Sequence, residues 1–278
     1  MSGINHTGGK HDDGCQMPQS ISAWGLVLFH CHEPNACPHF LYSRDVCVKV
    51  KEGRERDFSA YLQDVPVKLA KVRLDAGRIA SYTIAEAVAP AGRAARCDYH
   101  IVTGYEGFPP EAPSPEQTAA DMKKVGISIT REAMISKRDE LSYLVGVDVW
   151  AYWARVGTPR KGGYARINYD KVHPGMGAEW VTLETTGWQQ LAEAASKEYG
   201  TSWRVATLAM AGGNSLPYNA MTVDIFPSWE AFGKGLPTRA LWNKVHPERD
   251  MSATMTRLAE VRDRPRVDTD KLIEVMTR

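Results

Sequence analysis

The sequence matches itself at a spacing of about 120 residues. Three pairs of segments recur in the same order: KVKEG at 49–53 with KVHPG at 171–175, SY at 81–82 with SW at 202–203, and YHIVT at 99–103 with YNAMT at 218–222. Their offsets are 122, 121 and 119 residues, and small changes of offset at loops are typical of a diverged duplication. The sequence therefore predicts two copies of one structural unit.

Both copies predict the same order of elements. Val46, Val48 and Val50 alternate with Cys47 and Lys49, which indicates a strand, and the next segment carries one apolar stripe at helical spacing. The elements expected in the first copy are strands over 46–50, 79–88, 99–105 and 145–153, with helices over 58–72 and from 114. Those expected in the second are strands over 202–210, 219–226 and 271–276, with helices over 180–194 and 251–262. The order β-α-β-β-α-β is the ferredoxin-like arrangement, so the fold class is α+β.

Two local signals refine these elements. Pro66 lies inside the first helix and should disturb it, because proline lacks the amide donor and crowds the preceding turn. Ser114, Pro115 and Gln117 form a helix start, with serine as the N-cap and proline at the first helical position. We expect a flexible, irregular N-terminal tail over 1–42, a first unit over 43–156 and a second unit over 164–278, joined by a glycine- and proline-containing linker.

Cysteine and histidine are concentrated in the tail. Three of the five cysteines and five of the eight histidines lie in the first forty residues. Thiolate and imidazole ligands suit zinc, but paired C-x-x-C motifs are missing, so a tail without metal is the expected alternative. A start codon upstream of the true one would also explain this tail. The candidate metal ligands are His30, Cys31, His32, Cys37 and His39.

Charge and cysteine count limit the class of protein. Lysine and arginine number 34 against 33 acidic residues, a net charge of +1, so the basic excess typical of nucleic-acid binding is absent. No apolar run reaches the roughly 18 residues of a membrane span. An odd number of cysteines argues against a disulfide framework and favours a reducing compartment, so we expect a cytoplasmic protein. The sequence also lacks the GxxxxGK[ST], GxGxxG, GxSxG and HExxH motifs.

A family resemblance rests on three motifs: KVHPG at 171–175, YNAMT at 218–222 and LWNKVHP at 241–247. Together with the repeat, they resemble the dimeric α/β-barrel superfamily, which includes antibiotic-biosynthesis-type monooxygenases and NIPSNAP-like and EthD-like proteins. The resemblance covers 46–276. It implies that two tandem ferredoxin-like units pack their antiparallel sheets into an α/β barrel with helices outside. Members include cofactor-independent oxygenases, isomerases, haem enzymes and proteins without established activity.

The resemblance also implies a pocket between a sheet and its own helices. Met221, Val223 and Ile225 alternate and are expected to face the helices, and the repeat alignment turns His100 the same way. His100 can carry a proton near neutral pH, so His100 and neighbouring Tyr82 are the candidate catalytic residues. The alternative is a core histidine bonded to a carbonyl or hydroxyl group. The candidate pocket residues are Asn219, which matches His100 in the repeat, Trp203, Trp150 and Asp148.

These observations lead to one functional hypothesis and two alternatives. We expect a protein that binds a small-molecule ligand, as a cofactor-independent oxygenase or isomerase acting on an aromatic or polyketide-like compound. The alternatives are a non-catalytic ligand-binding or structural barrel, and a haem or metal enzyme in which His173 or His246 is the axial ligand. No cofactor, nucleic acid or membrane partner is predicted, and homodimer formation is left open.

Overall fold

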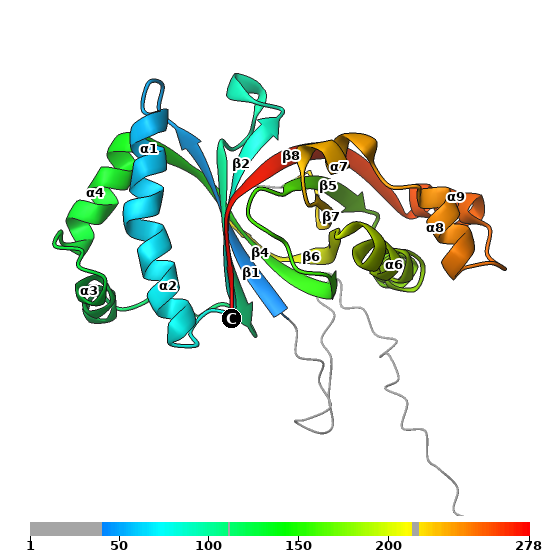
Figure 1. Ribbon diagram of the computed structural model, residues 1–278, viewed down its shortest axis with the longest axis horizontal. Coiled ribbons are helices and arrows are strands. Elements are labelled where there is room, and N and C mark those ends of the chain that lie inside the picture. The colour runs from blue at the N-terminus through cyan, green and yellow to red at the C-terminus, as the bar shows by residue number, and fades with distance from the viewer. Residues whose placement is uncertain (1–40, 111, 213–216) are drawn as a thin grey trace, which may run out of the picture. The chain divides into compact units, whose positions relative to one another are not determined.

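The computed structural model describes residues 41–110, 112–212 and 217–278 (Figure 1). Within these residues each half contains four strands, and both halves follow the predicted β-α-β-β-α-β order. The first half consists of β1 Leu41–Val50, α1 Glu55–Leu62, α2 Lys68–Asp75, β2 Ser81–Ala89, β3 Tyr99–Glu106, α3 Pro115–Lys124, α4 Arg131–Leu141 and β4 Ser142–Val156. The second consists of β5 Tyr164–Val172, α5 Gly177–Leu183, α6 Gln189–Tyr199, β6 Ser202–Gly212, β7 Ala220–Phe226, α7 Trp229–Lys234, α8 Thr238–Val245, α9 Met251–Val261 and β8 Arg262–Thr277.

The eight strands close into a barrel in the order β1-β3-β2-β8-β5-β7-β6-β4. All neighbouring strands are antiparallel, and the two four-stranded sheets join where β2 pairs with β8 and β4 pairs with β6. Helices α1 to α4 lie on one side, and α6, α8 and α9 lie on the opposite side (Figure 1). The predicted fold class, two ferredoxin-like units forming an α/β barrel, is confirmed. Within the described part of the chain, no helix is long and apolar enough to cross a membrane.

The first long helix of each half is interrupted by a π-helical turn at the same place. This turn spans Gln63–Val67 in the first half and Glu184–Trp188 in the second, an offset of 121 residues. Pro66 lies within the first turn, as its missing amide donor led us to expect. The second turn contains no proline, so proline is not the cause of the interruption. The π-helical turn is a feature of both halves, and Pro66 fits into the first one. Turns of this kind are common at functional positions in helices.

Backbone contacts fix how the two halves correspond. The amide of Val50 donates to Asp98 Oδ2 at 2.8 Å, and the amide of Val172 donates to Asn219 Oδ1 at 2.7 Å. Asn219 therefore corresponds to Asp98 at an offset of 121 residues. The match between Asn219 and His100 was wrong. The two similar pentapeptides suggested an offset of 119 residues, whereas the equivalent hydrogen bonds of Asp98 and Asn219 set an offset of 121.

Both faces of the sheets are buried, and the side chains that were predicted to face the helices point into the barrel instead. Met221, Ile225 and His100 line the barrel interior, whereas Ala220 and Tyr99 pack beneath the helices. Because a closed barrel covered by helices has two buried faces, apolar alternation cannot show which face is inside. The expected pocket between sheet and helices was therefore placed on the wrong side.

Several element boundaries also differ from the predicted ones. Strand β1 begins at Leu41, two residues before the predicted unit boundary, and β8 begins at Arg262 and not near 271. Helix α4 was not predicted; its N-cap is Thr130, whose hydroxyl accepts from the amide of Ala133 at 3.2 Å. The Ser114 cap is confirmed, since its hydroxyl accepts from the Gln117 amide at 3.2 Å. The tail over 1–40 and its predicted flexibility lie outside the described residues.

Candidate functional site

A cavity of about 340 Å³ occupies the barrel interior. It reaches the surface at the end of the barrel where β1 begins and β4 and β8 end, because its lining there includes the exposed residues Arg155, Thr158 and Arg278. We call this end of the cavity the mouth. The volume of the whole cavity is in the range of about 300–1,000 Å³ that is usual for small-molecule sites.

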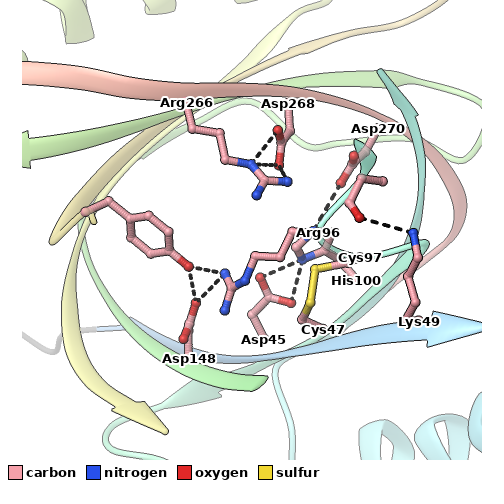
Figure 2. Close-up of polar contacts among 12 residues, drawn as sticks. Asp45, Cys47, Lys49, Arg96, Cys97, His100, Asp148, Arg266, Asp268 and Asp270 are labelled. Atoms are coloured by element: carbon pink, nitrogen blue, oxygen red, sulfur yellow. Dashed lines mark hydrogen bonds and ion pairs between the residues drawn. A yellow bond between two sulfur atoms is a disulfide. The ribbon is translucent and has the colours of Figure 1, made fainter. Parts of the chain in front are cut away.

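His100 lies on the cavity wall between two carboxylates. Its Nδ1 atom is 3.0 Å from both carboxylate oxygens of Asp45, and its Nε2 atom is 4.0 Å from Asp270 Oδ2. Figure 2 shows the three side chains converging from strands β1, β3 and β8. His100 is 4% exposed and Asp270 is 1% exposed, and neither oxygen of Asp270 has a hydrogen-bond partner among the described residues. Asp45 thus fixes the imidazole ring, and the other ring nitrogen faces Asp270.

The surroundings raise the pKa values of both groups. Burial alone would lower the pKa of His100, but the charge and hydrogen bond of Asp45, together with the charge of Asp270, raise it to about 9. Burial raises the pKa of Asp270 to about 6, although the positive charge of His100 opposes this. At neutral pH His100 is therefore an imidazolium and most Asp270 is ionised. A weakly basic carboxylate beside a cationic acid is a common arrangement for proton transfer.

Away from the mouth, aromatic and aliphatic side chains form most of the remaining cavity wall. The hydroxyl groups of Tyr152 and Ser43 form a hydrogen bond of 3.1 Å, in which either can be the donor. Trp150 is fully buried, and its indole nitrogen has no acceptor among the described residues. Other large apolar side chains of the wall include Val102, Ile167, Tyr169, Met221, Val223, Ile225 and Leu272. Such a wall suits a flat, largely apolar molecule.

A second polar network lies inside the barrel but outside the cavity lining. The Tyr218 hydroxyl donates to Asp148 Oδ2 at 2.9 Å, and Arg96 Nη1 is bonded to Tyr218 and lies 3.5 Å from the same carboxylate oxygen. Arg266 and Asp268 pair at 2.7 Å (Figure 2). Asp148 Oδ2 and both oxygens of Asp268 accept hydrogen bonds here, and Asp148 Oδ1 accepts none. Asp270 differs in that neither of its oxygens has a hydrogen bond among the described residues.

A disulfide joins Cys47 to Cys97 beside this network (Figure 2). Cys47 lies opposite His100 in the β1–β3 ladder, and Cys97 directly follows Arg96. The odd cysteine count argued against a disulfide framework, but it leaves room for a single bridge. Structural disulfides persist mainly in oxidising environments. The cytoplasmic localisation therefore stays a prediction, and this bond argues against it.

The predicted site residues separate into two groups. His100 and Trp150 line the cavity, and Asp148 lies nearby in the second network. Tyr82 and Trp203 pack in the helix-facing cores of the two halves, on the other side of the sheet from His100. Burial raises the pKa of Tyr82, whose hydroxyl has no partner among the described residues. Pairing Tyr82 with His100 in one site was therefore wrong.

Asn219 does not line the cavity either. Its amide group exchanges two hydrogen bonds with the backbone of Val172, at 2.7 and 3.0 Å. It closes the start of β7 against the end of β5, as Asp98 does in the other half. Its polar side chain thus has a structural partner and needs no ligand.

Sequence reasoning missed Asp45 and Asp270. Asp148 is an acid within an apolar strand, and Asp45 shows a weaker form of this signal because it directly precedes the alternating Val46, Val48 and Val50 of β1. The start of β8 is polar, and Asp270 lies there between Thr269 and Lys271, so this signal is missing. Asp268 and Asp270 alternate with Val267 and Thr269, as residues on one face of a strand do. Applying the rule to every strand would have singled out Asp45 but not Asp270. Their convergence on His100 would still have required the barrel register.

The candidate haem and metal ligands do not meet at this cavity. His246 Nε2 is 2.8 Å from the carbonyl of Gly187, and His173 Nδ1 is 3.0 Å from the carbonyl of Glu260. Neither histidine lines the cavity. Over 41–110, 112–212 and 217–278, no group of three or more histidine, cysteine or acidic side chains is arranged to hold a metal ion. The candidate ligands His30, Cys31, His32, Cys37 and His39 lie outside the described residues.

Comparison with known proteins supports the fold. No protein-family model matches the sequence, and a search of curated proteins found no match. Two solved structures of putative monooxygenases share the architecture at 9% identity. The one from Lactobacillus acidophilus NCFM has a TM-score of 0.51 and aligns over 86% of this chain and 95% of its own. The one from Fusobacterium nucleatum subsp. nucleatum has a TM-score of 0.52 and aligns over 86% of this chain and 94% of its own. At this identity the likeness shows a shared α/β-barrel fold and no particular activity.

Proposed function

We propose that the barrel cavity binds a small aromatic molecule and that Asp270 and His100 move a proton on it. The observation that carries this proposal is the Asp270 carboxylate. It is buried, lacks hydrogen bonds among the described residues, and faces a histidine that a second carboxylate holds charged. Burying a carboxylate without hydrogen bonds destabilises the folded protein. A substrate that donates a proton to Asp270 would supply the missing partner and explain why the carboxylate is there.

In this proposal each of the three groups has its own role. Asp270 takes the proton from a carbon next to a carbonyl group or from a phenolic hydroxyl, and the electron pair stays on the substrate as an enolate or phenolate. The His100 imidazolium, 4.0 Å from Asp270, stabilises the negative oxygen that forms. Asp45 is a positioning residue, because it touches His100 and keeps the ring oriented and charged.

The fate of the anion separates the two reaction classes. If Asp270 returns the proton to a different carbon, the reaction is an isomerisation and needs no other reactant. If molecular oxygen oxidises the enolate, the reaction is an oxygenation with oxygen as co-substrate. The second class is the one that the names of the two putative monooxygenases describe, while the likeness to them shows the fold alone. Both classes require the first proton transfer.

Hydrogen–deuterium exchange tests that shared step. We would incubate 2-tetralone, a bicyclic aromatic ketone with an acidic carbon, in deuterated buffer and follow exchange at that carbon by NMR. The wild-type protein should accelerate exchange, and Asp270→Asn should lower the rate to background, since a general base contributes about 100- to 10,000-fold. Tyr82→Phe is the matched control, because Tyr82 lies on the other face of the sheet. Ligand binding without exchange would instead indicate a non-catalytic binding protein.

A further inference from the structure

Two arginines at the mouth of the cavity have no acidic partner. Arg155 and Arg204 lie opposite each other in the β4–β6 ladder, and both line the cavity. In the described part of the chain, no carboxylate forms a hydrogen bond or ion pair with either guanidinium. This is unusual for Arg204, which is only 7% exposed, because buried charges are normally paired. We call Arg155 and Arg204 the arginine pair.

The hydrogen bonds of Arg204 leave part of its guanidinium free. Its Nη1 atom donates to the carbonyls of Val156 and Trp203, both at 2.6 Å, and its Nη2 atom donates to the carbonyl of Gly157 at 2.9 Å. A guanidinium has five N–H groups, so Nε and one hydrogen on Nη2 have no acceptor among the described residues. Donors on two adjacent nitrogens of arginine are the ones that hold a carboxylate in a bidentate manner.

The inner wall has the opposite charge. Asp45 and Asp270 lie there with His100, and a second negative group on a ligand would be repelled at this end. Tyr152 lies on the wall between the two ends, because it precedes Arg155 in β4 and its hydroxyl is 3.1 Å from that of Ser43, which precedes Asp45 in β1. Burial raises the pKa of Tyr152; the positive charge of Arg204 opposes this shift and the negative charge of Asp45 adds to it. One aromatic side chain thus lies within electrostatic reach of both ends.

We propose that the cavity takes an aromatic monocarboxylate whose carboxylate binds the arginine pair and whose opposite, uncharged end reaches Asp270 and His100. The side chains of Trp150 and Tyr152, which line the cavity between its two ends, contact the aromatic ring of the ligand. The assignment of the inner end rests on the proposed function, whereas the arginine pair recognises the anion whether or not proton transfer occurs.

Three naphthalene probes separate these features by calorimetry. The probes are 6-hydroxy-2-naphthoate, its neutral amide 6-hydroxy-2-naphthamide, and naphthalene-2,6-dicarboxylate. The wild-type protein should bind the hydroxynaphthoate about tenfold more tightly than the amide, a factor that one charge-assisted hydrogen bond can supply. The dicarboxylate should bind more weakly than the hydroxynaphthoate, because its second carboxylate would face Asp45 and Asp270.

Two arginine variants provide the test and its control. Arg155→Gln should lower the affinity for the hydroxynaphthoate about tenfold and leave amide binding unchanged. Arg160→Gln removes a nearby exposed arginine that does not line the cavity and should change neither affinity. Equal wild-type affinity for hydroxynaphthoate and amide, no binding of the hydroxynaphthoate, or no effect of Arg155→Gln would overturn the inference.

Failure of the proposed function gives a different result. If the wild-type protein does not catalyse exchange but Arg155→Gln still abolishes the preference for carboxylate over amide, the anion site stands and proton transfer does not. If exchange depends on Asp270 but Arg155→Gln does not change the affinity for the hydroxynaphthoate, proton transfer stands and the anion site does not.

Discussion

Replacing Asp45 with asparagine should remove the pH dependence of stability that His100 causes. The pKa of His100 is about 9 in the folded protein, and its ordinary value is 6.5. A raised histidine pKa stabilises the folded state fully below pH 6.5, and this stabilisation is lost as the pH rises through 9. At 1.36 kcal/mol per pH unit, the difference corresponds to about 3 kcal/mol of unfolding free energy.

Asp45 is the largest favourable influence on the charged imidazole, and burial acts against it. In the Asp45→Asn variant burial should dominate, so His100 should be neutral at pH 7 and the loss of stability between pH 6.5 and 9.5 should shrink to near zero. Urea unfolding at several pH values measures this, and NMR titration of the imidazole gives the pKa directly.

Two controls make the result specific. His100→Gln should show the same flat profile as Asp45→Asn, whereas His173→Gln should keep the wild-type profile, because His173 lies outside the barrel interior and its side chain is 38% exposed. If the wild-type protein and Asp45→Asn lose the same free energy between pH 6.5 and 9.5, the explanation of the high His100 pKa by Asp45 is wrong.

Two further predictions concern Asp270 and the disulfide. Asp270→Asn should raise the unfolding free energy at pH 8 by about 1–3 kcal/mol while abolishing exchange. A folded-state pKa of about 6, above the ordinary 3.8, means that ionisation destabilises the fold as the pH rises through 6. Lower stability of this variant at pH 8 would contradict the prediction. Reducing the Cys47–Cys97 bond, which closes a loop with a sequence separation of 50, should lower stability by about 2–4 kcal/mol. Urea midpoints with and without reductant measure this. The double variant Cys47→Ser/Cys97→Ser should not respond to reductant, and an unchanged wild-type midpoint would refute the prediction.

Local patterns in the sequence predicted most of the elements. The alternation of Val46, Val48 and Val50 lies within β1, and the Ser114 cap begins α3 where expected. The repeat predicted equal halves, and equivalent π-helical turns and strand orders are found in both. The strand and the cap depend on residues near one another in the chain, and the repeat is found by comparing two stretches of one sequence, so a single sequence contains this information. His100 was recognisable as a titratable group on an apolar strand for the same reason.

Tertiary structure alone decided which face of the sheet became the interior. Helices cover the outside and side chains line the inside, so both faces are buried, and the parity of His100 against Met221 and Ile225 could not tell them apart. The meeting of Asp45, His100 and Asp270 depends on the register of three strands that lie far apart in sequence. Closure of the barrel sets that register. The same closure places Arg155 opposite Arg204 at the mouth, because the β4–β6 ladder joins the two halves and no local pattern specifies its alignment.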